Sequence, residues 1–366
     1  MHLRELAWDG FRNLEVRRLA LSPGFNVFEG ENAQGKTNVL EAAWWLATLR
    51  PLRAARLTEL VRFGAKTAQV EAQIERDALV HKLAVRVVEG ARQSLREGKL
   101  AKPADYFGAL AVVVFTPDDA GLVRAAPAER RRYLDRAIFT GRPGHLQTTA
   151  THKRALEARN ELLRTGAASD VVEAFEWTLA GHAAALVAAR RRFIEDFAPQ
   201  VAETFSEIAG EGVTARVVYR PSVDSDAPEA HRAALEDDRA RDRERGHTQR
   251  GPQADDLGIE VQGRSGRLYA SQGQQRALVL ALKIAEIRLL EALFALTPVL
   301  LLDDVSSELD PRRNERLFAL LHGYRGQVLI TTTDAAVLRV PRAARLFRVR
   351  AGQVDAEGEV AERTGA

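Results

Sequence analysis

The apolar residues of this chain fall into a few short runs, each followed by a distinctive polar segment. FNVF (25–28), VLLL (299–302) and VLI (328–330) have the length and continuity of strands that are buried on both faces of a parallel sheet. A longer run, ALVLALKIAEI (277–287), is typical of a helix. The pattern predicts an α/β fold whose buried strands deliver polar groups at their carboxyl ends.

The segment after the first run reads GENAQGKTN (30–38) and leads into a helix expected from about Lys36. G-x-x-x-x-G-K-[ST] between a strand and a helix is a phosphate-binding loop, or P-loop. Gly30 and Gly35 let backbone N–H groups surround phosphate oxygens, Lys36 reaches the β- and γ-phosphates, and Thr37 offers a hydroxyl to Mg²⁺. The other residues expected to line the nucleotide are Glu31, Asn32, Ala33, Gln34 and Asn38. The predicted cofactors are ATP and Mg²⁺.

Two acids follow the second run, Asp303 and Asp304. A carboxylate at the end of a buried strand completes the metal shell of Mg²⁺–nucleotide sites, so we expect Asp303 to hold the magnesium through water. The candidate catalytic residues are Asp304, which would orient or deprotonate an attacking water, and Lys36 of the P-loop. Taken alone, the two acids are also typical of a strand that ends in helix-capping residues. The third run ends in Thr331–Asp334, where a group could sense the γ-phosphate, although Thr and Asp also simply end strands.

ASQGQQR (270–276) opens the long apolar run, and Ser271 with Gln274 fits a capping box. Gly273 then falls in the first helical turn, where alanine would stabilise the helix by roughly 1 kcal/mol more. A bare backbone beside free N–H groups at a helix start is an anion-binding device. We therefore expect Ser271, Gly273 and Gln274 to contact a phosphate, with a plain helix cap as the alternative. Because the P-loop already holds a nucleotide, this second loop suggests head-to-tail dimers in which each chain closes the other's site.

Composition narrows the function classes. The 366 residues are 46% hydrophobic, enough for one large core or two modest ones, and the lack of cysteine excludes disulfides and thiol chemistry. The charged N-terminus has no signal-peptide core, and no apolar stretch reaches the ~18 residues that span a bilayer. We expect a soluble, cytoplasmic protein with no membrane partner. A net charge of +3 and a pI near 9.3 permit nucleic-acid binding without demanding it.

The middle of the chain changes character. Residues 127–210 have helical periodicity; Gly166 is expected to end one helix and Asp170 with Glu173 to cap the next, which predicts a hairpin about 60 Å long. The charged segment 222–255 is expected to be a mobile loop or a single exposed helix. The ATPase head would then consist of residues 1–120 and 256–366, and residues 121–255 would form an inserted, mainly helical arm.

Three arginine clusters are candidate phosphate contacts if the chain binds DNA, which is implied mainly by the family resemblance that follows: Arg50, Arg53 and Arg56, then Arg130–Arg132, then Arg190–Arg192. Such clusters make binding salt-dependent, but an arginine triplet on a helix is more often a solvated face. No base-reading module is evident, so recognition is expected to depend on charge and shape.

Several segments together resemble the RecF family, in the SMC branch of the ABC-type ATPases. They are FRNL (11–14), GENAQGKTN (30–38), FTPDD (115–119), RRRYLD (130–135), TQRGPQADDL (248–257), ASQGQQR (270–276) and LLLDDVSSELD (300–310). The resemblance covers nearly the whole chain and implies a P-loop ABC/SMC-type ATPase head, with a mixed sheet and helices, interrupted by a helical arm. Gln253 and Ala254 replace the family's usual His-Arg. No Q-loop glutamine follows Phe115, so Asp118 or Asp119 is expected to stand in.

The resemblance implies a DNA repair and recombination mediator. It would dimerise on ATP, bind duplex DNA near single-strand gaps, and help load the recombinase with partners of the RecO/RecR type. Slow, DNA-dependent ATP hydrolysis would drive release. Roles in replication and the SOS response to DNA damage, and a nucleoid-associated location, are implied in the same way. One alternative is an ATPase subunit of a transporter, but the helical insertion is longer than expected for that class. Another is a subunit of a chromosome-structuring complex, but the insertion is too short for that class and has no hinge domain.

Overall fold

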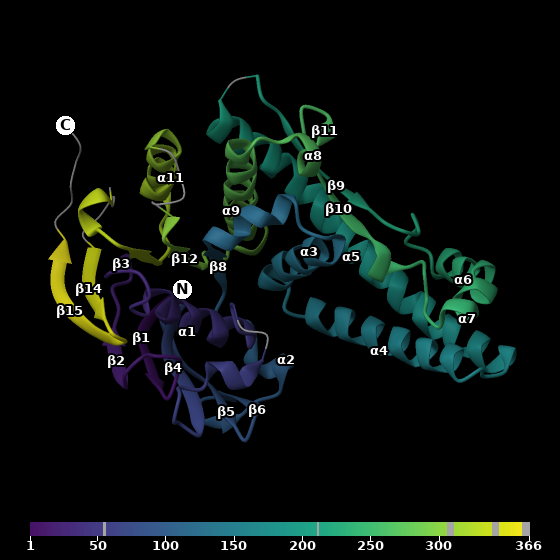
Figure 1. Ribbon diagram of the computed structural model, residues 1–366, viewed down its shortest axis with the longest axis horizontal. Coiled ribbons are helices and arrows are strands. Elements are labelled where there is room, and N and C mark those ends of the chain that lie inside the picture. The colour runs from purple at the N-terminus through teal and green to yellow at the C-terminus, as the bar shows by residue number, and fades with distance from the viewer. Residues whose placement is uncertain (54–55, 211, 306–310, 339–343, 361–366) are drawn as a thin grey trace. The chain divides into compact units, whose positions relative to one another are not determined.

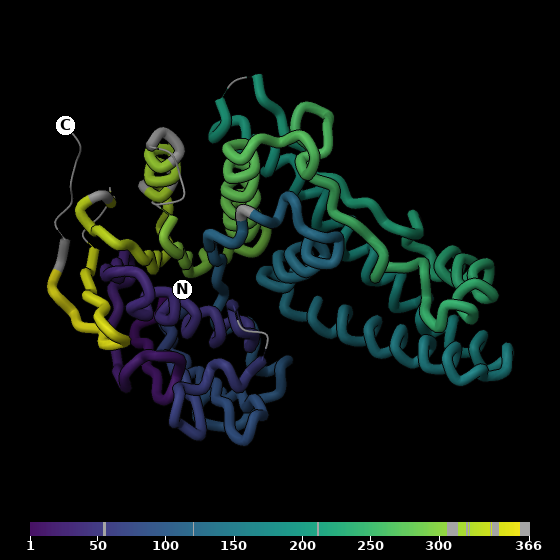
Figure 2. The backbone as a smooth tube through the Cα atoms, in the orientation of Figure 1, coloured from purple at the N-terminus to yellow at the C-terminus, as the bar shows by residue number. Residues whose placement is uncertain are grey.

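The computed structural model describes residues 1–53, 56–210, 212–305, 311–338 and 344–360. The chain forms two compact units, Met1–Asp119 with Leu290–Ala366, and Ala120–Leu289. We refer to the first as the head and to the second as the arm. Figure 2 traces how the chain leaves the head and returns to it.

The head is built on two six-stranded sheets (Figure 1). Its strands are β1 His2–Asp9, β2 Arg17–Ala20, β3 Phe25–Glu29, β4 Thr67–Arg76, β5 Leu79–Val88, β6 Ala91–Arg96, β7 Lys99–Leu100, β8 Val112–Phe115, β12 Val299–Asp303, β13 Val328–Thr332, β14 Ala344–Arg350 and β15 Gln353–Val360. The antiparallel sheet runs β2-β1-β4-β5-β6-β7. The second sheet runs β15-β14-β3-β13-β12-β8 and is parallel except for the β14–β15 hairpin. All three apolar runs predicted as strands lie in this second sheet.

Helix α1 (Lys36–Thr48) packs between the two sheets, against β12 and β13 of one and β4 and β5 of the other. Its residues Val39–Ala47 are all buried, as expected for a helix that is apolar on every side. Trp45 stacks on Phe11 with ring centroids 5.5 Å apart. This packing fixes the start of α1 at the carboxyl end of β3. The head also contains α2 Pro103–Tyr106 and α11 Pro311–Gly323, with 3₁₀ turns at Leu57–Leu60 and Ala335–Val337, and a further 3₁₀ turn, Pro117–Val123, where the chain passes into the arm.

The arm contains the predicted helical hairpin, formed by α4 and α5. Its elements are α3 Pro127–Gly141, α4 His145–Arg164, α5 Ser169–Ala209, β9 Ala215–Arg220, α6 Pro228–Asp237, α7 Arg239–Arg245, a 3₁₀ turn Pro252–Ala254, β10 Asp256–Val261, β11 Arg264–Ser265, α8 Gly266–Tyr269 and most of α9 Gln272–Phe294, whose last residues, 290–294, belong to the head. Gly166 ends α4 at a φ of 69°, as predicted. The predicted cap of α5 is wrong, because the helix begins at Ser169 without a side-chain cap and Asp170 already lies in its first turn.

The predicted head–arm boundary differs from the observed one. Strand β10 pairs along its whole length with β9, from Asp256 opposite Arg220 to Val261 opposite Ala215. In addition, Arg288 of α9 forms an ion pair with Glu207 of α5 at 2.8 Å. Residues 256–289, which we assigned to the head, therefore group with the arm.

The charged segment 222–255 is neither a mobile loop nor a single exposed helix, because it folds into α6 and α7 around buried charges. Arg159 of α4, which is 0% exposed, donates to Glu176 of α5 at 2.9 Å and to Asp242 of α7 at 2.7 Å. Arg239 adds a second ion pair to Glu176 at 2.6 Å. Because these buried carboxylates are paired with arginines, the charged segment packs against the other helices of the arm and is not solvated as the sequence suggested.

One helix among the described residues, α5, is long and apolar enough to cross a membrane by length and composition alone. The sequence expectation that no stretch reaches this length is therefore not met. Of the qualifying window, 44% is buried inside the structure, and Glu176 in α5 is fully buried in the ion-pair network described above. Core helices of soluble proteins pass the same test.

Candidate functional site

The P-loop lies where the sequence predicted it, between β3 and α1. Gly35 has a φ of 109°, which favours glycine, and a Cβ there would lie 2.7 Å from Asn13 Oδ1. A Cβ on Gly30 would lie 2.3 Å from the carbonyl oxygen of Val349. Both positions therefore require glycine, and the loop can wrap its backbone closely around a ligand.

Lys36 is buried inside this loop, with only 6% of its surface exposed. Its Nζ donates to the carbonyl oxygens of Gly30 at 2.6 Å and Glu31 at 2.8 Å. Burial lowers the pKa of Lys36, while the charges of Asp304 and Asp303 raise it. The ammonium thus lies in the centre of the loop, held by acceptors that phosphate oxygens can replace.

Asp303 ends β12 with 2% of its surface exposed and lies against the start of α1. Its Oδ1 accepts hydrogen bonds from Thr37 at 2.7 Å and from Thr331 at 2.9 Å, and its Oδ2 accepts one from Arg53 at 2.6 Å. The structure thus brings the two predicted metal residues together, although they are far apart in the sequence. Hydroxyl and carboxylate oxygens are hard donors that suit Mg²⁺. This donor set and the glycine-lined loop fit a magnesium–triphosphate.

Asp304 follows directly, in the left-handed region at a φ of 47°. Its backbone N–H donates to Thr331 Oγ1 at 2.9 Å. A non-glycine residue in this conformation is held there by its surroundings, which is common at functional sites. Thr331, the first residue of the range 331–334 in which we expect a γ-phosphate sensor, is fully buried and forms hydrogen bonds to both acids. Residues 306–310, the SSELD part of the family motif, lie outside the described residues.

Sequence reasoning did not assign Arg12 and Asn13 to the site, although their side chains support the P-loop and α1. Asn13 Oδ1 accepts from Asn38 Nδ2 at 2.7 Å, while Gln34 accepts from the backbone N–H of Ala351 at 2.6 Å. Arg12 forms a bidentate pair with Glu41 of α1, at 2.8 and 3.0 Å. The motif FRNL marked Arg12 and Asn13, but only as a resemblance.

Of the two acids proposed to replace the Q-loop glutamine, only Asp118 faces solvent. Asp119 accepts hydrogen bonds from the backbone and side chain of Thr116, at 2.8 and 3.1 Å, and so caps the turn that follows β8. The side chain of Asp118 is 83% exposed, and its Oδ2 lies 4.0 Å from Arg53 Nε. Asp118 is therefore the better candidate.

The second predicted phosphate-binding loop belongs to the arm. The backbone N–H of Ser271 donates to Gln274 Oε1 at 2.9 Å, and the N–H of Gln274 donates to Ser271 Oγ at 3.2 Å. This confirms the predicted capping box at the start of α9. Ser271 is exposed, and Gly273 is half-buried in the first turn. Just before them, Leu268 and Tyr269 are 72% and 65% exposed.

Two of the three arginine clusters are largely occupied by structural ion pairs. Arg130 is bidentate with Asp256, and Arg190 pairs with Asp135 at 2.8 Å and with Asp255 at 3.0 Å. Burial would raise the pKa of Asp135, but hydrogen bonds from His145 and Arg190 outweigh it and hold the pKa at about 2. Asp255 and Asp256 are the two acids of GPQADDL (251–257). In the same motif, the side-chain amide of Gln253 donates to the backbone carbonyls of Thr248 and Arg250.

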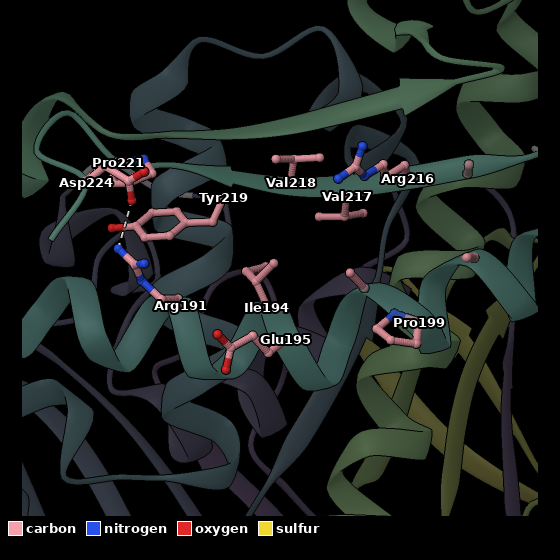
Figure 3. Close-up of a pocket in the computed structure, with 13 residues that line it drawn as sticks. Arg191, Ile194, Glu195, Pro199, Arg216, Val217, Val218, Tyr219, Pro221 and Asp224 are labelled. Carbon is pink, nitrogen blue, oxygen red and sulfur yellow. Dashed lines mark hydrogen bonds and ion pairs between the residues drawn. The ribbon is translucent and has the colours of Figure 1, made fainter. Parts of the chain in front are cut away.

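A groove of about 480 Å³ lies between α5 and β9 (Figure 3). Arg191 of the third cluster lies at one end, where Asp224 and Asp226 pair with it at 2.9 and 3.1 Å. Arg132 and Arg192 of the arm clusters are exposed, as are Arg50 and Arg56 in the head. None of the residues predicted to bind the nucleotide lines the groove.

Residues 2–355 match the family model described as the RecF/RecN/SMC N terminal domain. The chain is 46% identical over 369 residues to the DNA replication and repair protein RecF of Anaeromyxobacter sp. (strain K), covering 97% of this chain and 99% of that relative. It is similar to the solved structure of "the recombination mediator protein RecF-ATP in RecFOR pathway", with a TM-score of 0.89, 29% identity and 97% of each chain covered. An SMC head bound to the C-winged helix domain of ScpA shares the fold at a TM-score of 0.60 and 17% identity, over 99% of this chain and 98% of that one.

Proposed function

The chain belongs to the RecF family of DNA replication and repair proteins, whose members are SMC-like, ATP-binding ATPases, and from this we propose that it is an ATP-switched DNA-binding mediator. Two copies join head to tail around ATP, bind duplex DNA near a single-strand gap, and help proteins of the RecO/RecR type to load the recombinase. Hydrolysis then releases the DNA. The protein works in the cytoplasm, on the nucleoid.

The observation that carries this proposal is the solvent-facing capping box at the start of α9. Ser271 still has its hydroxyl proton to donate, and Gly273 places a backbone without a side chain in the first turn of α9, where N–H groups have no acceptor within the helix. Both residues belong to a different unit from the P-loop. Leu268 and Tyr269, exposed directly before the box, suit a surface that a second chain covers. Such a loop on one copy would complete the phosphate site of the other.

Within each copy, Gly30, Gly35 and Lys36 hold the phosphates, while Thr37 and Asp303 hold Mg²⁺. The metal would neutralise charge on the β- and γ-phosphates. The carbonyl oxygens of Gly30 and Glu31 hold the Lys36 ammonium inside the loop, and the charges of Asp303 and Asp304 partly offset the cost of its burial. Hydrogen bonds of Asn13 and Gln34 fix the shape of the loop.

DNA binding rests on arginines that have no acidic partner among the described contacts, namely Arg50, Arg56, Arg132 and Arg192. Their guanidinium groups would contact phosphates without reading bases. The ion-paired Arg130 and Arg190 are withdrawn from the list of candidates, because both side chains are buried and already occupied. Arg130 is bidentate with Asp256, and Arg190 pairs with the fully buried Asp255.

The proposal is tested by sedimentation with ATP, ADP or no nucleotide, with and without gapped duplex DNA. We expect a dimer and gap-preferring binding with ATP and Mg²⁺ only, since the γ-phosphate bridges the two chains. A dimer equally populated with ADP, or a stable monomer with ATP at micromolar protein, would contradict it. DNA affinity should also fall steeply as salt is raised.

Asp304→Asn should slow hydrolysis by about 100-fold while ATP binding is retained, because the amide cannot accept a proton from water. The ATP-bound dimer should then persist on DNA, as measured by its dissociation rate after dilution. Asp105→Asn, an exposed acid of the head, serves as the control and should leave both rates unchanged. Release as fast as in the wild type would show that hydrolysis does not time it.

A further inference from the structure

Arg53 is the one predicted DNA-contacting arginine whose side chain forms an ion pair inside the nucleotide site. Its Nη2 lies 2.6 Å from Asp303 Oδ2, and the Oδ1 of the same carboxylate is taken by Thr37 and Thr331. The carboxylate is 2% exposed, whereas the Arg53 side chain is 42% exposed. The half-exposed guanidinium of Arg53 is therefore paired with the buried carboxylate of Asp303, the residue that we propose binds Mg²⁺.

The backbone around Arg53 is fixed by contacts that lead back to the P-loop. The N–H groups of Leu52 and Arg53 donate to Glu41 Oε1 at 2.9 and 3.3 Å. Glu41 is 1% exposed and is bidentate with Arg12, whose neighbour Asn13 lies against Gly35. The position of Arg53 is therefore set by Glu41 of α1, the helix that follows the P-loop.

We propose that Arg53 is a cationic latch on Asp303 that Mg²⁺ must displace. This inference deepens the proposed function and rests on its metal site. A divalent cation and a guanidinium repel each other at one carboxylate, so occupancy by one weakens the other. Mg²⁺ is a compact cation that prefers oxygen ligands, whereas guanidinium is weakly hydrated and easily withdrawn to another acceptor.

That acceptor is Asp118, whose Oδ2 already lies 4.0 Å from Arg53 Nε. Asp118 is 83% exposed, so a displaced guanidinium can pair with it without being buried. Binding of the metal thus moves the Arg53 side chain from the buried Asp303 to the exposed Asp118. The surface of the head after α1 then has a different arrangement of charges with and without Mg²⁺–nucleotide. Before displacement, the latch neutralises Asp303 and stabilises the buried carboxylate.

Removing the latch should make the site bind Mg²⁺ more readily. In the full chain with saturating fluorescent ATP analogue, Arg53→Gln should lower the half-saturating Mg²⁺ concentration by roughly tenfold, since one charge-assisted hydrogen bond no longer competes. In EDTA without nucleotide, the same variant should melt at a lower temperature than the wild type, and Mg²⁺ alone should recover most of the loss. The matched control is Arg17→Gln, which removes an arginine from an exposed ion pair with Asp355 elsewhere in the head and should change neither value.

Asp118→Asn tests the second half of the switch and does not depend on how well Arg53→Gln folds. Loss of the outer acceptor should raise the half-saturating Mg²⁺ concentration by about threefold, the opposite direction. If wild type and variants all fail to respond to Mg²⁺, the proposed metal site is wrong and the latch falls with it. A normal wild-type response that Arg53→Gln leaves unchanged or weakens would overturn the latch alone, and no effect of Asp118→Asn would overturn the transfer to Asp118.

Discussion

Lys36→Met is expected to lower ATP affinity by at least about two orders of magnitude and to abolish ATP-dependent dimerisation. Methionine keeps the apolar stem that packs in the loop but cannot donate where Nζ now donates, to Gly30 and Glu31. The phosphates would then enter a buried site without its cation, beside the two acids Asp303 and Asp304. Their repulsion of a triphosphate would no longer be balanced.

The measurements are equilibrium binding of a fluorescent ATP analogue and sedimentation with ATP and Mg²⁺. Lys66→Met, which removes an exposed lysine from the same unit, should bind and dimerise normally. The melting temperature of Lys36→Met without nucleotide should stay close to the wild-type value, which separates lost binding from lost folding. A variant that still dimerises on ATP would show that the P-loop lysine is not what senses the nucleotide.

The elements around the nucleotide could be predicted from sequence because their signals are local. A run such as VLLL has the periodicity of a buried strand, and the glycine spacing of residues 30–38 reflects backbone conformations that other residues avoid. The capping box of Ser271 and Gln274 spans only three positions. Each of these patterns is decided by neighbours in the chain, so no tertiary knowledge was needed.

Side-chain partners distant in sequence had no such signal. Arg53 was grouped with Arg50 and Arg56 as a DNA contact, yet the chain doubles back along α1 and delivers it to Asp303. The sequence marks residues 331–334 only as a polar strand end, and strand pairing between β12 and β13 is what places Thr331 beside both acids. These contacts depend on the order of the strands in the sheet, and the sequence of one strand does not indicate which strands lie beside it.

Charge density misled the prediction for residues 222–255. A segment rich in acids and arginines is usually solvated, but here Arg159 of a different helix pairs with Asp242 inside the arm. Likewise, Arg130 and Arg190 pair with acids of the GPQADDL motif and with Asp135. The composition of a segment gives the number of its charged residues. Whether those residues are buried depends on whether oppositely charged side chains lie beside them once the helices have packed.

Ser271→Arg should separate nucleotide binding from dimerisation. The bulky side chain would occupy the place where we propose that the other copy's phosphate docks, while the P-loop belongs to a different unit. Nucleotide binding by the monomer should survive within about tenfold, a change of no more than ~1.4 kcal/mol. ATP-dependent dimerisation, ATPase activity and ATP-enhanced DNA binding should be lost together. Ser169→Arg, at the exposed start of α5, is the control and should behave as the wild type.

Mixing Ser271→Arg with Lys36→Met is the sharper test of a composite site. A mixed dimer has one intact interface, made from the P-loop of the Ser271→Arg chain and the capping box of the Lys36→Met chain. Some heterodimer or weak ATPase activity should therefore return on mixing, although neither variant dimerises alone, if one intact site suffices. A Ser271→Arg protein that dimerises normally with ATP would show that the capping box does not act across the interface. Because each variant disables a different half of the site, their recovery on mixing cannot arise from a site formed within a single chain.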